Sequence, residues 1–126
     1  MKKIISTINA PTAIGPYSQA VEANGTLYIS GQIPVNPTTG KIVEGGVTEQ
    51  TEQVIANIKA ILAEANLEIE NVVKSTVFLA DMSYFAEMNE VYKKHYTENF
   101  PARSTIAVKG LPMGALVEIE TIAVRF

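Results

Sequence analysis

Few side chains in this sequence can do chemistry, and Arg103 is the first of them. It follows Phe100, Pro101 and Ala102, and Pro101 stiffens the backbone from which the guanidinium would project. Arginine is the side chain best suited to hold a carboxylate through two parallel hydrogen bonds. The alternative is an ordinary surface or ion-pairing arginine, which composition alone favours. Arg103 is therefore a candidate carboxylate-binding residue.

Two carboxylates, Glu118 and Glu120, share one face of an otherwise apolar segment near the C-terminus. In a monomer with one solvated face they would be ordinary surface residues. If another subunit covers that face, at least one carboxylate is partly buried and needs a partner, for which Arg103 is a candidate. Such a pair can orient and activate a water molecule, or it can be a structural ion pair. The strand period does not separate Glu118 from Glu120.

Composition excludes several other kinds of site. The chain has no cysteine, which removes thiolate catalysis and thiolate metal sites, and its single histidine cannot form a multi-histidine metal centre. That residue, His95, falls on the apolar stripe of a predicted helix, which favours packing over catalysis. No Walker loop or dinucleotide fingerprint is present. We therefore expect neither a cofactor nor a metal.

Charge and targeting patterns bear on partners and location. A net charge of −3 argues against binding to nucleic acid or to anionic membranes. Only two apolar residues follow the basic start, whereas a secretory signal needs about seven or more. The longest apolar runs are far shorter than the roughly 18 residues of a membrane span. The expectation is a cytoplasmic protein with a single domain over residues 1–126.

The elements that must position these residues follow from periodicity. Helical spacing of apolar residues predicts helices over residues 51–65 and 85–96, with Thr48 as the first N-cap and Asn66 as its left-handed terminator. Strands are predicted at residues 3–8, 18–23, 27–33, 72–79, 105–109 and 116–126. The order β-β-β-α-β-α-β-β indicates an α+β fold with a sheet of about six strands and two helices.

That order leaves one sheet face without cover. Two helices can lie across one face of such a sheet but not across both. Segments 72–79 and 116–126 nevertheless carry apolar side chains on both faces. An uncovered apolar face is most simply buried by another subunit, so we expect an oligomer.

Four motifs follow one another along the chain. They are IGPYSQA at residues 14–20, SGQIP at 30–34, FPARS at 100–104 and VEIE at 117–120. Together they resemble the RidA/YjgF family, and specifically its RidA branch of imine deaminases, from end to end. The resemblance implies a chorismate-mutase-like fold and a homotrimer with sheets facing inward. The sites of such a trimer lie in clefts between subunits, which agrees with the expectation of an oligomer.

The resemblance also implies an activity. This is the hydrolysis of 2-iminobutanoate and 2-iminopropanoate to 2-keto acid and ammonia, without a cofactor. Pyridoxal-phosphate enzymes such as threonine or serine dehydratase would release these reactive imines, and their removal would prevent damage to other enzymes. An imine already hydrolyses in water, so positioning the substrate and one water is the catalysis required.

By the same resemblance, Arg103 would hold the substrate carboxylate and Glu118 would handle the attacking water and its proton. Glu118 is preferred to Glu120 because its spacing from Arg103 matches the family. The pocket would be lined by Tyr17, Ser30, Gly31, Asn89 and Thr105. Thr105 stands where some members carry cysteine, which puts thiol-based behaviour in doubt and leaves a water mechanism intact.

The alternative hypothesis is a trimer that binds small carboxylates in a regulatory or chaperone-like role and turns nothing over. RNA cleavage, proposed for some relatives, is disfavoured by the net charge of −3. The presence of both Arg103 and a correctly spaced Glu118 favours the enzyme.

Overall fold

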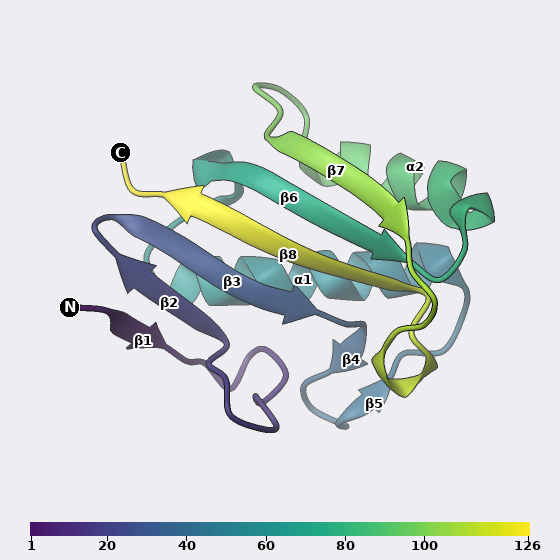
Figure 1. Ribbon diagram of the computed structural model, residues 1–126, viewed down its shortest axis with the longest axis horizontal. Helices are drawn as coiled ribbons and strands as arrows, with labels where there is room; N and C mark the ends of the chain where they lie inside the picture. The colour runs from purple at the N-terminus through teal and green to yellow at the C-terminus, as the bar shows by residue number, and fades with distance from the viewer.

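A six-stranded sheet forms the front of the molecule in Figure 1, with strand order β1-β2-β3-β8-β6-β7. The computed structural model describes all residues from 1 to 126. Neighbouring strands are antiparallel except β6 and β7, which are parallel. The strands are β1 Lys3–Ile5, β2 Ala20–Ala23, β3 Thr26–Gln32, β6 Val72–Leu79, β7 Ala102–Ala107 and β8 Val117–Val124. The predicted α+β class and the sheet of about six strands are confirmed.

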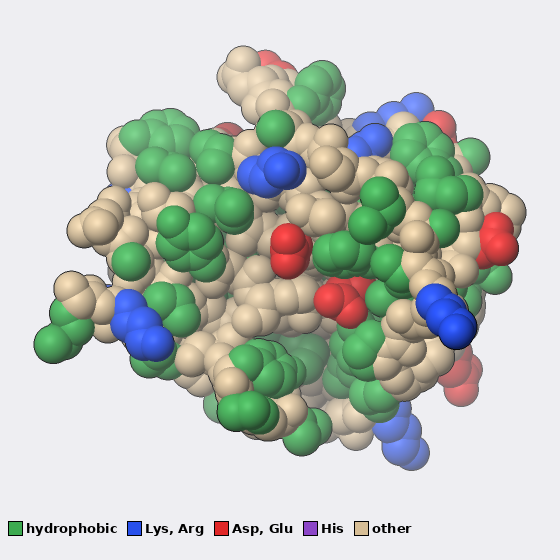
Figure 2. All heavy atoms as spheres, viewed as in Figure 1, with side chains coloured by type: hydrophobic (Ala, Val, Ile, Leu, Met, Phe, Trp, Pro, Cys, Tyr) green, Lys and Arg blue, Asp and Glu red, His purple; other side chains and the backbone are tan.

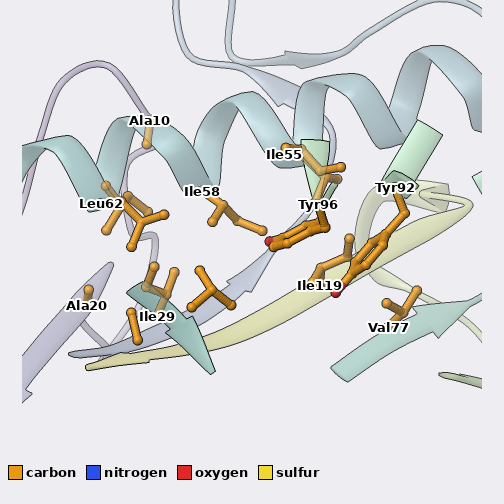
Figure 3. Close-up of a cluster of buried hydrophobic side chains, with 14 of the residues drawn as sticks. Ala10, Ala20, Ile29, Ile55, Ile58, Leu62, Val77, Tyr92, Tyr96 and Ile119 are labelled. Atoms are coloured by element: carbon orange, nitrogen blue, oxygen red, sulfur yellow. The ribbon is translucent and has the colours of Figure 1, made fainter. Parts of the chain in front are cut away.

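Both helices, α1 (Val47–Glu64) and α2 (Phe85–His95), lie behind the sheet on the same face (Figure 1). Helix α1 packs across β3 and β8 and contacts α2. Figure 3 shows Ile55, Ile58 and Leu62 of α1 directed at the sheet. There they belong to the same buried cluster as Ile29 and Ile119. Residues of β1, β2, β3, β6, β8 and both helices share this core, to which β7 contributes none. The structure contains no helix with the length and hydrophobicity that a membrane span requires.

The ends of α1 partly match the prediction. Asn66 adopts φ 57°, so the predicted left-handed terminator is confirmed. The predicted N-cap, Thr48, is wrong, because the cap residue is Gly46 and Thr48 lies in the first turn. Glu49 accepts a hydrogen bond from the Gly46 N–H at 2.8 Å, which satisfies a donor that would otherwise be free at the helix end.

The strand bounds show where periodicity is informative. Strand β6 matches the prediction over residues 72–79, whereas β7 begins at Ala102, three residues before the predicted 105. Arg103 therefore lies within a strand, not in a loop before one. The hairpin of β4 (Val35–Asn36) and β5 (Lys41–Ile42) was not predicted, because two-residue strands are too short to show a period.

The face opposite the helices is apolar and uncovered within this chain. Ile4, Tyr28 and Ile106 lie on it and are about half exposed, at 52%, 51% and 48%. Figure 2 looks onto this face and shows hydrophobic side chains spread over it, with acidic side chains near its middle. The prediction that the helices cover only one face of an apolar sheet is confirmed.

Candidate active site

Arg103 lies on the helix-covered face of the sheet. It pairs in register with Ser75 of β6, which is fully buried under α2. The guanidinium carbon Cζ is 4.7 Å from the centroid of the Tyr92 ring and 5.7 Å from that of Phe85. Its Nη1 donates a hydrogen bond to Asn89 Oδ1 at 2.8 Å. Arg103 is thus held by two rings and an amide, all from α2.

The Arg103 side chain lines a cavity of about 390 Å³. The cavity is lined by Asn89, Tyr92, Lys93, Tyr96, Phe100, Pro101 and Arg103. None of the salt bridges in the structure involves Arg103, so its charge has no carboxylate partner within the chain. Arg103 therefore forms no ion pair within one chain, and its charge is available to an external anion.

Glu118 lies on the opposite, open face. It sits between Val117 and Ile119, both fully buried on the helix side, and pairs in register with Phe78. Its side chain is partly buried among the apolar residues of that face. Burial, and to a smaller extent the charge of Glu120, raises the pKa of the Glu118 carboxyl above its ordinary value. A carboxylate with a raised pKa is a better proton acceptor than a solvated one.

A β-bulge places Gly31 against Glu118. Ile29 pairs with Thr121 and Gln32 pairs with Ile119, so two residues, Ser30 and Gly31, stand opposite one residue of β8. A Cβ on Gly31 would lie only 2.9 Å from the Glu118 carboxyl carbon Cδ. The absence of a side chain at position 31 is therefore what lets the carboxylate lie over the bulge.

The segment that carries Tyr17 is tied to the same bulge. Ser30 donates from its hydroxyl to the Ser18 carbonyl at 2.6 Å and from its N–H to the Gln19 carbonyl at 2.9 Å. Gln19 is buried, and its side chain bonds back to the N-terminal loop. Tyr17 itself is about half exposed, at 54%.

The predicted site residues thus separate into two groups. The first, called here the arginine cluster, comprises Arg103, Asn89 and Thr105 on the helix face. The second, the carboxylate cluster, comprises Tyr17, Ser30, Gly31 and Glu118 around the bulge. Thr105 lies two residues beyond Arg103 on the same face of β7, and its hydroxyl is buried without a hydrogen-bond partner. The two clusters occupy opposite faces of one sheet, so a single chain does not bring Arg103 and Glu118 together.

Sequence reasoning missed Tyr92 and Phe85 as neighbours of Arg103. Both fall on the apolar stripe of the second helix, where periodicity assigns them to the core. The partly buried His95 bonds to Glu52 at 2.7 Å and Lys59 at 2.8 Å on α1, away from both clusters. No three His, Cys, Asp or Glu side chains gather in an arrangement that would hold a metal ion.

Comparison with known proteins places the chain in a family. Residues 7–125 match the family described as Endoribonuclease L-PSP. The chain belongs to this family. It is 50% identical over 125 residues to the 2-iminobutanoate/2-iminopropanoate deaminase of Mus musculus, covering 99% of this chain and 93% of the relative. The resemblance to RidA/YjgF proteins is thereby confirmed.

Solved structures of the family agree with the fold. RidA from the Antarctic bacterium Psychrobacter sp. is 46% identical with a TM-score of 0.94, covering 98% of this chain and 99% of that one. TdcF of E. coli, solved with bound serine, is 45% identical with a TM-score of 0.94 and the same coverage of both chains. The family fold therefore extends over nearly all of this chain.

Proposed function

We propose that this protein hydrolyses 2-imino acids, among them 2-iminobutanoate and 2-iminopropanoate, to 2-keto acids and ammonia. The observation that carries the proposal is the arginine cluster: a cation with no carboxylate partner, fixed over an aromatic ring at the edge of a cavity. Relatives about 50% identical over nearly the full length bear the name of this activity, which supports the same conclusion.

The reaction needs no covalent nucleophile. Arg103 would hold the substrate carboxylate, with Asn89 occupying Nη1 and leaving the other guanidinium N–H groups for two parallel hydrogen bonds. Glu118 would accept a proton from the attacking water as the water oxygen bonds to C2. The carboxyl proton then passes to nitrogen, which gives a tetrahedral intermediate with a hydroxyl and an amine on C2. Glu118 would next carry the hydroxyl proton to the amine, so that the C–N bond breaks as the C=O bond forms, and keto acid and ammonia leave. Catalysis on this scheme comes from positioning and proton transfer.

A second copy of the chain would complete the site. Because the two clusters face opposite ways, Arg103 of one subunit can meet only the Glu118 of another. We infer a homotrimer whose open sheet faces point inward, which would also bury the apolar surface of Figure 2. The mass in solution is expected to be three times 13.6 kDa. A monomer at micromolar concentration would contradict the shared site.

The substrate must be supplied by another enzyme. 2-Imino acids arise when a pyridoxal-phosphate dehydratase acts on threonine or serine and releases the enamine, so such an enzyme is the proposed functional partner. RNA as a substrate is not supported, because the net charge is −3 and the basic side chains in Figure 2 are scattered over the face.

A coupled assay tests the proposal. Threonine dehydratase generates 2-iminobutanoate, semicarbazide traps what is not hydrolysed, and the protein is added in catalytic amount. We expect trapped product to fall with the wild type and not with Arg103→Ala, which should remain a trimer. If the wild type changes nothing but still binds 2-oxobutanoate by calorimetry, the protein is a carboxylate-binding trimer and the enzyme proposal is wrong.

A further inference from the structure

The ring of Tyr92 is the nearest aromatic neighbour of the Arg103 guanidinium, with 4.7 Å between Cζ and the ring centroid. Tyr92 is itself immobilised. It is only 5% exposed, its hydroxyl donates to Ser75 Oγ at 3.1 Å, and its ring stacks on Tyr96 with 4.2 Å between centroids. Figure 3 shows the two rings side by side between the helices and the sheet.

We propose that Tyr92 is a positioning residue that holds the Arg103 guanidinium in the plane required to receive the substrate carboxylate; this rests on the proposed function. Two restraints are needed to fix a planar group. Contact with the ring face fixes the plane of the guanidinium, and the Nη1 bond to Asn89 fixes its rotation within that plane. The guanidinium edge not bonded to Asn89 is then presented to the cavity with little side-chain freedom left to lose on binding.

An aromatic support has an advantage over an acidic one. A carboxylate beside Arg103 would also hold the guanidinium, but it would neutralise the charge and compete with the substrate carboxylate for the same N–H groups. The ring attracts the cation through its face and accepts none of those hydrogen bonds. Burial raises the pKa of Tyr92, so the phenol stays neutral and its hydroxyl remains a donor to Ser75.

The chain offers a matched set of variants. Tyr92→Leu removes the ring under Arg103, and Tyr92→Phe keeps the ring while losing the bond to Ser75. Val91→Ala is the control, because Val91 lies next to Tyr92 on α2 and is equally buried, at 1%, yet it neither lines the cavity nor contacts Arg103 with a ring. If Tyr92→Leu does not fold, Tyr92→Met removes the ring while filling more of the space.

Steady-state kinetics separate positioning from general damage. We expect Tyr92→Leu to raise KM for 2-iminobutanoate on the order of 2- to 30-fold, the range of one cation–π contact, with kcat changed less than about threefold. Tyr92→Phe should keep KM near the wild-type value. Val91→Ala should lower the melting temperature without raising KM. An unchanged KM in Tyr92→Leu, or an equal rise in Val91→Ala, overturns the proposal.

A spectroscopic readout does not depend on turnover. Ring current from Tyr92 should shift the side-chain proton signals of Arg103, assigned by comparison with Arg103→Lys. The shift should persist in Tyr92→Phe and fall in Tyr92→Leu to the smaller contribution of the more distant Phe85 ring. Binding of 2-oxobutanoate, measured by calorimetry, should weaken in the same order as KM rises. If the wild type proves inactive, the proposed function fails, but these two measurements still test the role of Tyr92. A chemical shift that is not reduced in Tyr92→Leu, or an affinity for 2-oxobutanoate that is unchanged, refutes that role.

Discussion

The arginine cluster and the carboxylate cluster are built by different physical means. Arg103 is held by side chains of α2, an aromatic face and an amide, on the helix-covered side of an edge strand. Glu118 is held by backbone geometry, because the bulge at Ser30 and Gly31 makes room for its carboxylate on the open side. The cation needs neutral support so that it stays available to an anion. The carboxylate needs an apolar setting so that its pKa rises.

The comparison also explains why neither cluster is a complete site. On the proposed mechanism, one face supplies substrate binding and the other supplies proton transfer. A sheet separates the two halves within a chain, so only packing between chains can join them. Changes in either cluster should therefore produce distinct kinetic defects.

The largest expected effect is on turnover when Glu118 is neutralised. Glu118→Gln should lower kcat by about 10²- to 10⁴-fold, because the general base is lost, while 2-oxobutanoate binding through Arg103 is retained. Coupled-assay kinetics and calorimetry measure the two quantities. Glu120→Gln is the matched control, since Glu120 lies on the same face but is exposed. An inactive Glu120→Gln beside an active Glu118→Gln would show that the roles are reversed.

The next largest effect concerns the bulge. Gly31→Ala places a Cβ against the Glu118 carboxylate and forces it to move, so kcat should fall by roughly 10²-fold, the cost of about 1 Å of misplacement. Gly110→Ala is the control, because a Cβ at Gly110 meets nothing within 4 Å. Full activity in Gly31→Ala, with the fold checked by circular dichroism, would exclude a role for the placement of Glu118 over the bulge.

Mixing two inactive variants tests whether the clusters meet across subunits. Equimolar Arg103→Ala and Glu118→Gln chains, co-expressed or refolded together, should assemble at random. About one quarter of the sites then combine an intact Arg103 with an intact Glu118, so about a quarter of wild-type activity should return. A site within one chain would recover nothing on mixing. The double variant, carrying both changes, provides the background rate.

The smallest effect is a displacement of the pH profile. On the proposed mechanism the Glu118 carboxylate is the active form. Because the pKa of Glu118 is raised, kcat should rise at a higher pH than it would with an ordinary glutamate. Part of that increase in the pKa of Glu118 comes from the negative charge of Glu120. Glu120→Gln should therefore lower the pKa of Glu118 and move the acid limb of kcat to lower pH. If the acid limb of the kcat profile lies at the same pH in Glu120→Gln and in the wild type, Glu118 does not titrate in the rate-limiting step.

Local patterns account for much of the fold. The strand at residues 72–79 and the left-handed residue Asn66 just after α1 were predictable, because alternation and a left-handed terminator act over a few residues. The start of α1 was not predictable in this way, because its N-cap residue is Gly46, which has no side chain. Its backbone N–H donates instead to the Glu49 carboxylate. The alignment of the bulge at Ser30 and Gly31 with Glu118 depends on the register between β3 and β8, which no local pattern reports.

The order and periodicity of the elements were enough to predict the class of fold and the apolar sheet face that two helices leave uncovered. The opposite faces of Arg103 and Glu118, and the place of Tyr92 against the guanidinium, follow from how the elements pack in three dimensions. The physical reason is the distance over which each kind of interaction acts. Periodicity reports which side of its own element a residue occupies, whereas the contact of Arg103 with α2 and the register of β3 on β8 depend on how separate elements pack against one another.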